Sequence, residues 1–155
     1  MSLQRAKEYL EKFNMADRVI EFDSSSATVS EAAKAAGCTE GEIAKTLSFS
    51  VDEKPILIVV AGNVKIDNSK YKAEYHTKAK MLAFDDVEKL IGHAVGGVCP
   101  FGIEKNVDVY LDVSLKRFDM VYPACGSSNS AIKLTIDELE KTSAYIKWVD
   151  VCKEI

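Results

Sequence analysis

The stretch Ile56–Ala61 is the feature that most limits how this chain can fold, because every residue in it is apolar. A continuous apolar run of this length is typical of a central strand that is covered on both faces. The preceding segment, Lys45–Val51, alternates in the two-residue period of a second strand. Asp52, Glu53 and Lys54 form a turn between the two segments. We therefore expect two neighbouring strands in the middle of a sheet.

Helices and strands intermix along the rest of the chain. We expect helices over 3–13, 67–75 and 86–91, and further helices that begin at the capping boxes of Thr28 and Thr135. We expect further strands over 18–22, 80–84, 107–113, 120–124, 131–136 and 145–151, and the one over 107–113 has a single apolar face made by Val107, Val109, Leu111 and Val113. This order favours an α+β fold with a mixed sheet over a regular βαβ winding. The 155 residues show no repeat and no linker, which predicts one domain over 1–155.

Composition excludes several classes of protein. A chain with 47% hydrophobic and 28% charged residues is neither disordered nor of low complexity. No apolar run approaches the roughly 18 residues of a membrane span, and the first residues lack the apolar core of a signal peptide. We expect a cytoplasmic protein that does not associate with membranes.

The cysteines and histidines do not form a metal-binding pattern. The cysteines lie far apart and none belongs to a CxxC motif; they are Cys38, Cys99, Cys125 and Cys152. Neither His76 nor His93 has a cysteine or histidine at ligand spacing. We expect four reduced thiols and no metal.

The charge distribution is uneven. The net charge is −4, so the chain is not a generally basic nucleic-acid coat. The segment Lys65–Lys80 is different, because its five lysines against Asp67 and Glu74 give it a local charge of 5 − 2 = +3. It is either a footprint for an RNA backbone or a solvated helix face.

Lys45 is the first candidate for chemistry. It shares a strand face with Leu47, Phe49 and Val51, whereas Thr46, Ser48 and Ser50 lie on the other face. Because a buried ammonium is costly, Lys45 must reach a partner, lose its proton or extend its stem to water. Both a strand-end lysine and a functional lysine that faces a pocket fit this position.

The second candidate is the loop Gly96–Gly102, whose sequence is GGVCPFG. Its glycines allow the backbone to approach a ligand closely and to direct amides at a developing oxyanion. An awkward turn between two elements explains the same residues equally well. Cys99 lies in this loop as a candidate nucleophile, although a packed thiol is the simpler interpretation.

The third candidate is the turn Gly126–Ser130 between two expected strands. Its residues suit a hairpin and require no function, although its hydroxyls and amides could line a polar pocket.

These motifs occur in a recognisable order. The segment GEIAKTL (residues 41–47), the strand ILIVVAG, the loop GGVCPFG and a Gly-Ser turn before AIKLTIDEL resemble the YbaK / prolyl-tRNA synthetase-associated domain family. The similarity runs from about Thr28 to Leu139. It implies a single α+β domain around a mixed, curved, partly barrel-like sheet flanked by helices.

The resemblance also implies roles for individual residues. It implies catalytic roles for Lys45, Gly96 and Gly97, in which Lys45 holds the terminal phosphate or polarises the ester carbonyl and loop amides hold the carbonyl oxygen. It implies substrate contacts from Thr46, Cys99, Pro100, Phe101, Gly102, Gly126 and Ser127. Relatives often carry Ser or Thr at the position of Cys99, which argues against an enzyme nucleophile there. No cofactor and no metal are implied.

The activity implied is hydrolysis of the ester on a mischarged tRNA, in trans. The segment Tyr122–Lys133 has no histidine, unlike that of alanine-editing relatives, so the Cys-tRNA(Pro) type is expected. The partners implied are aminoacylated tRNA and prolyl-tRNA synthetase, with the chain a monomer or a homodimer. Two alternatives remain: a non-catalytic module that docks RNA or a synthetase, and a small-molecule hydrolase that uses the same pocket.

Overall fold

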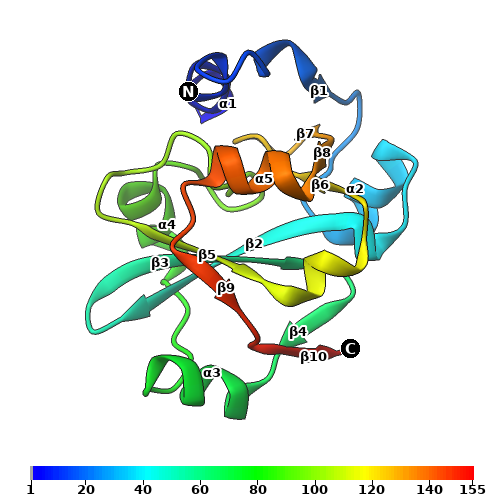
Figure 1. Ribbon diagram of the computed structural model, residues 1–155. Helices are drawn as coiled ribbons and strands as arrows, with labels where there is room; N and C mark the ends of the chain where they lie inside the picture. Colours follow the sequence, from blue (N-terminus) through cyan, green and yellow to red (C-terminus); the bar gives the residue numbers. More distant parts are fainter. Residues whose placement is uncertain (1) are drawn as a thin grey trace.

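The computed structural model describes residues 2–155, in which short helices surround a curved mixed sheet (Figure 1). The strands are β1 Val19–Glu21, β2 Ile43–Val51, β3 Lys54–Ala61, β4 Val64–Ile66, β5 Asp108–Asp112, β6 Met120–Pro123, β7 Ser130–Ile132, β8 Leu134–Thr135, β9 Lys147–Val149 and β10 Cys152–Glu154. The α-helices are α1 Ser2–Glu11, α2 Val29–Ala36, α3 Asn68–Tyr75, α4 Phe84–Ile91 and α5 Ile136–Ser143. Three 3₁₀ turns cover Ala16–Arg18, Glu40–Glu42 and Val113–Arg117.

The main sheet has the strand order β8-β6-β2-β3-β5-β9. Strand β3 pairs antiparallel with β2 and parallel with β5, and its residues from Pro55 to Ala61 are all buried. The predicted central strand and the α+β class with a mixed sheet are therefore confirmed. The turn between β2 and β3 places Asp52 and Glu53 at φ of 51° and 67°, the backbone of a tight hairpin turn of matching twist.

All five predicted helices are present, although α1 ends two residues before the predicted Phe13 and α4 begins two residues before the predicted Asp86. Thr28 and Thr135 form capping boxes with Glu31 and Glu138, which satisfy the first amides of α2 and α5. Gly37 ends α2 in the left-handed region, where glycine carries no steric penalty.

The predicted strands over 80–84 and 107–113 need correction, and the one predicted over 131–136 is two strands, β7 and β8, with Ile136 already in α5. Residues 80–84 do not form a strand, because Met81 makes only an isolated bridge to Phe49 and Phe84 already begins α4. Strand β5 ends at Asp112, whose carboxylate accepts a hydrogen bond from the Ser114 amide and starts a 3₁₀ turn. Val113 is consequently 37% exposed and leaves the apolar face predicted for it.

The two faces of the sheet carry different elements. Helix α3 lies on one side with β4 and β10, below the sheet in Figure 1, whereas α1, α4 and α5 lie on the other. Phe49 of β2 packs on Tyr71 of α3, with ring centroids 5.2 Å apart. Because side chains alternate along a strand, Lys45 shares the α3 side with Phe49, and Thr46 lies on the opposite side.

Candidate active site

A cavity of about 380 Å³ lies beside β2, on the side where the sheet is incomplete. Its walls come from the loop before α2, the start of α2, β2, residues 81–87, the loop after α4, and β6 with β7. The lining is mainly apolar and contains no carboxylate; it consists of Ser26, Ala27, Thr28, Val29, Ala32, Ile43, Ala44, Lys45, Thr46, Leu47, Ser48, Met81, Leu82, Phe84, Val87, Val95, Gly96, Val98, Tyr122, Ala124, Ser130 and Ala131. Such a cavity suits a small, mostly apolar group.

The cavity exists because part of the outer edge of β2 has no strand beside it. Strand β6 pairs with β2 only at Ile43 and Ala44. Farther along the edge, the Ser48 carbonyl accepts a hydrogen bond from the Leu82 amide at 3.2 Å. In the part of the chain that the structure describes, Thr46 has no strand partner on this edge. Because backbone groups alternate in direction along an antiparallel strand, the Thr46 N–H and C=O point into the gap, as the Ser48 carbonyl does.

Two hydroxyls in the cavity wall are buried and have no hydrogen-bond partner among residues 2–155. They are the Thr46 Oγ1 and the Ser26 Oγ. A buried hydroxyl without a partner costs free energy, so it normally marks a place where a ligand or water completes the bonding. Ser26 is only 7% exposed.

Lys45 is half-buried and lines the cavity, but its ammonium bonds to β4 and not to the loop Gly96–Gly102. Its Nζ donates a hydrogen bond to the Val64 carbonyl of β4 at 2.6 Å. Burial lowers the pKa of Lys45, and the thiol of Cys152 opposes this shift. Among residues 2–155, no carboxylate forms an ion pair with Lys45. The ammonium is thus a desolvated charge without a counter-ion.

The two catalytic glycine candidates differ in position. Gly96 lines the cavity with φ of +100°, which favours glycine. Gly97 does not line it, and its amide already donates to the Ala94 carbonyl at 3.0 Å. A Cβ on Gly97 would lie 2.5 Å from the carbonyl carbon of Gly126, so this glycine permits the loop and the Gly126 turn to touch. The Gly97 amide therefore has no free hydrogen for an oxyanion.

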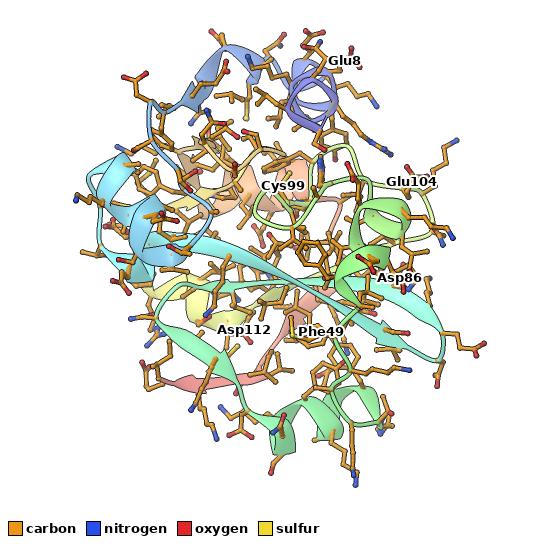
Figure 2. All side chains as sticks on the ribbon, turned by 180° about the vertical axis from the view of Figure 1, so that it is seen from behind. Glu8, Phe49, Asp86, Cys99, Glu104 and Asp112 are labelled. Atoms are coloured by element: carbon orange, nitrogen blue, oxygen red, sulfur yellow. The ribbon has the colours of Figure 1, made fainter. Side chains whose placement is uncertain are left out.

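The middle of the loop is buried packing and lies outside the cavity lining. Cys99 and Phe101 are fully buried, and Pro100 is buried beside them. Figure 2 shows Cys99 in the interior between α1 and the sheet. Burial raises the pKa of Cys99 to about 12, which keeps the thiol protonated and unreactive near neutral pH. The cavity lining does not include these three residues, and their substrate contacts stay a prediction.

His93 supports the loop from behind. It is fully buried, and its Nε2 lies 2.6 Å from the Phe101 carbonyl. Because a carbonyl only accepts, Nε2 carries the proton and donates, which leaves the buried Nδ1 without a partner among residues 2–155. Burial lowers the pKa of His93, so the ring is neutral near neutral pH.

The remaining predicted contacts also belong to the scaffold. Gly102 has φ of +70°, and its carbonyl accepts a hydrogen bond from Arg5 of α1. The Gly126 amide donates to the Gly97 carbonyl at 3.0 Å. Ser127 Oγ lies 2.6 Å from Ser130 Oγ, within the turn. Of the ten site residues proposed from the sequence, Lys45, Thr46 and Gly96 line the cavity.

The sequence interpretation missed other parts of the wall. Ser26 carries no functional pattern in the sequence, and residues 81–84 are expected there only as part of a strand. No local pattern identifies either, because both reach the cavity through tertiary packing against β2. Asn129 is a scaffold residue, since its Nδ2 donates to the Phe22 carbonyl at 3.1 Å and ties the turn to the chain beside β1.

Residues 2–155 contain no cluster of three or more His, Cys, Asp or Glu side chains that could hold a metal ion. Over the same residues, no helix combines the length and apolarity needed to cross a bilayer. The four cysteines are free thiols.

A family model described as "Aminoacyl-tRNA editing domain" matches residues 23–142, and the chain therefore belongs to this family of editing domains. YwhH of Bacillus subtilis (strain 168), which is uncharacterised, is 49% identical over 155 residues, and the match covers 99% of both chains.

Other similar proteins carry names that refer to tRNA(Pro) or to prolyl-tRNA synthetase. EbsC of Enterococcus faecalis, named as a candidate Cys-tRNA(Pro)/Cys-tRNA(Cys) deacylase, is 31% identical over 105 residues, 66% of this chain and 63% of EbsC. Proline–tRNA ligase of Bacillus cytotoxicus is 32% identical over 85 residues, 54% of this chain but only 15% of the ligase. A crystal structure of a candidate trans-editing enzyme for prolyl-tRNA synthetase has a TM-score of 0.88 and 28% identity, over 98% of this chain and 97% of that chain. The family predicted from the sequence motifs is confirmed, and with it an aminoacyl-tRNA editing function in general terms.

Proposed function

We propose that this protein is a deacylase that acts in trans on mischarged tRNA, with Cys-tRNA(Pro) as its substrate. The observation that carries the proposal is the cavity at the open edge of β2, in which two buried hydroxyls have no hydrogen-bond partner and Thr46 has no strand beside it among the described residues. Its family and its similarity to the candidate deacylase EbsC support the reaction and the substrate class.

In the proposed reaction, the aminoacyl group enters the cavity and its ester lies against β2. The Thr46 N–H donates to the ester carbonyl oxygen and stabilises the oxyanion that forms when the carbonyl carbon is attacked. Gly96 allows the loop backbone to come close on the other side. Neither Cys99 nor any other protein group acts as a nucleophile, because an activated ester requires mainly positioning and charge stabilisation.

The bonds that change belong to the substrate and a nucleophile. Water, or the thiol of a cysteinyl group, adds to the carbonyl carbon, and the bond from that carbon to the ribose oxygen breaks. The proton of the nucleophile ends on the ribose hydroxyl. Attack by the thiol gives a cyclic thioester that water then opens to free cysteine.

Lys45 supplies positive charge in this scheme. In the free protein its ammonium is held by the Val64 carbonyl, a neutral acceptor that a phosphate or an oxyanion can replace. Its flexible stem allows the ammonium to turn from β4 toward a phosphate at the edge of the cavity. The lack of a carboxylate partner leaves the whole charge available to the substrate.

The substrate assignment rests on the walls of the cavity. The side chain of cysteine is small and apolar, which suits a lining made mainly of Ala, Val, Leu and Ile residues. In this proposal the hydroxyls of Ser26 and Thr46, which are buried without a partner, accept hydrogen bonds from the amino group of the cysteinyl residue. Selection of tRNA(Pro) is shared with prolyl-tRNA synthetase as a partner.

The direct test is to incubate the protein with tRNA(Pro) charged with cysteine, alanine or proline and to measure released amino acid. We expect release of cysteine to be fastest. Binding of tRNA or synthetase without release of any amino acid would instead support a docking module, the alternative function. Hydrolysis of small esters but of no aminoacyl-tRNA would support a small-molecule hydrolase.

A further inference from the structure

The mouth of the cavity carries exposed apolar side chains that the proposed reaction does not use. Met81 is 60% exposed, Phe84 75% and Val95 49%, and all three line the cavity. They represent three of the seven large apolar side chains that are exposed among residues 2–155. Their concentration at one cavity mouth indicates a contact surface.

Phe84 lies on the apolar stripe of α4 although it is exposed. Residues 84, 87 and 91 share one face of this helix by their spacing. Ile91 is fully buried, Val87 is buried and lines the cavity, and Phe84 stands at the mouth. The stripe therefore runs from the core to the opening, where three quarters of Phe84 is exposed.

The identity of a partner for this ring follows from the proposed substrate. An aminoacyl group inside the cavity is joined directly to the terminal ribose of the tRNA. That ribose must lie at the mouth, and the base it carries must lie beside the rim. A base has an apolar π-face that stacks on aromatic side chains, whatever its sequence.

The charges beside the rim are consistent with a nucleic-acid end. Lys78 and Lys80 are exposed and precede Met81, whereas Asp85 and Asp86 are exposed and follow Phe84. Figure 2 shows Asp86 on α4, on the outer side of the molecule. The phosphates are attracted by the lysines and repelled by the carboxylates, so the backbone runs on the Met81 side while the base covers Phe84.

We propose that Phe84, flanked by Met81, is the platform on which the terminal base of the tRNA stacks while the aminoacyl group occupies the cavity. This assignment rests on the proposed function. Phe84 is a binding residue that positions the ester, and it takes no part in bond making.

The test uses acceptor-stem RNAs charged with cysteine whose terminal nucleotide carries adenine, 2-aminopurine or no base. The proteins compared are the wild type, Phe84→Ala, Phe84→Trp and the control Ile146→Ala. Ile146 is 53% exposed and does not line the cavity. Because these side chains are exposed, the variants are expected to fold, which circular dichroism verifies.

We expect the wild type to hydrolyse the adenine substrate about tenfold faster in kcat/KM than the abasic one, and to quench 2-aminopurine fluorescence. Phe84→Ala should remove both effects, and Phe84→Trp and Ile146→Ala should keep them. If Phe84→Ala keeps both, or the wild type shows neither preference nor quenching, the stacking proposal is overturned. Phe84-dependent quenching without release of amino acid supports the platform and rejects the deacylase. Hydrolysis that does not depend on the base or on Phe84 supports the deacylase and rejects the platform.

Discussion

The ammonium of Lys45 donates a hydrogen bond to the carbonyl oxygen of Val64 in β4 at 2.6 Å. Lys45 is held by a neutral group, and burial lowers its pKa. A desolvated charge of this kind is costly to the fold and useful to a site that binds anions.

Lys45→Met should separate activity from stability. We expect kcat/KM for deacylation to fall about a hundredfold, because a charge that stabilises the transition state is lost. The free energy of unfolding at pH 7 should fall by less than about 1 kcal/mol, since the lost hydrogen bond is offset by removal of a desolvated ammonium.

The pH dependence of the same variant has a definite sign. The pKa of Lys45 is lowered in the folded state, so the unfolded chain binds its proton more tightly, and the contribution of Lys45 to the free energy of unfolding rises as the pH increases from the folded-state pKa to about 10.5. The difference in free energy of unfolding between the wild type and Lys45→Met, measured by urea denaturation, should shift in favour of the wild type over that range.

Lys45→Arg keeps the positive charge and serves as the control for its loss. Loss of activity only through unfolding would contradict a catalytic role.

Thr46→Val should stabilise the protein and weaken substrate binding. It removes a buried hydroxyl without a partner and keeps the shape of the side chain, so we expect a gain of up to about 1 kcal/mol in unfolding free energy. KM for the aminoacyl-tRNA should rise. The matched control is Thr142→Val, which removes a hydroxyl bonded to the Glu138 carbonyl at 2.8 Å and should lower stability. Equal losses in both variants would show that Thr46 is structural.

Gly97→Ala should destabilise the protein more than Gly37→Ala. A Cβ at Gly97 would meet the Gly126 carbonyl carbon at 2.5 Å and push the two loops apart, at a cost of about 1–3 kcal/mol or more. Gly37 has φ of +72°, and a Cβ there would have nothing within 4 Å. Its alanine variant should therefore lose only about 1 kcal/mol of stability, from backbone strain. Thermal unfolding of both variants measures the difference in stability. An equal loss of stability in the two would contradict the close contact between Gly97 and Gly126.

His93 should make the fold sensitive to mild acid. Its pKa is lowered below about 6.5 by burial, so the unfolded chain takes up the proton first and stability falls as pH drops through that value. His93→Gln retains a donor for the Phe101 carbonyl and should lose less stability between pH 7 and pH 5 than the wild type. His76→Asn, at an exposed helix end, is the control and should behave as the wild type. If the stability of His93→Gln and of the wild type changes identically with pH, His93 is not the source of the acid sensitivity.

Much of the fold was predictable because its signals are local. The apolar run of β3, the alternation of β2, and the capping boxes at Thr28 and Thr135 each act within a few residues. Residues 80–84 gave a wrong prediction because their pattern suits a strand, whereas the edge of β2 accepts only one bridge there before α4 begins.

The motif residues were predictable as a set, but their placement was not. Gly97, Cys99 and Gly126 stand out in the sequence, yet packing turns them into the support behind the cavity. Ser26 carries no signal in the sequence and nevertheless forms part of the wall.

The sequence by itself determined the mixed α+β class, the approximate positions of most helices and of the central strands, and membership of the editing family, because periodicity, caps and motif order are encoded in neighbouring residues. Only the tertiary structure decided which groups remain unpaired. Whether the Thr46 hydroxyl or the Gly97 amide has a partner depends on segments far away along the chain, which meet only when the sheet closes around its core. An unsatisfied group is a property of three-dimensional packing, and no pattern of neighbouring residues specifies it.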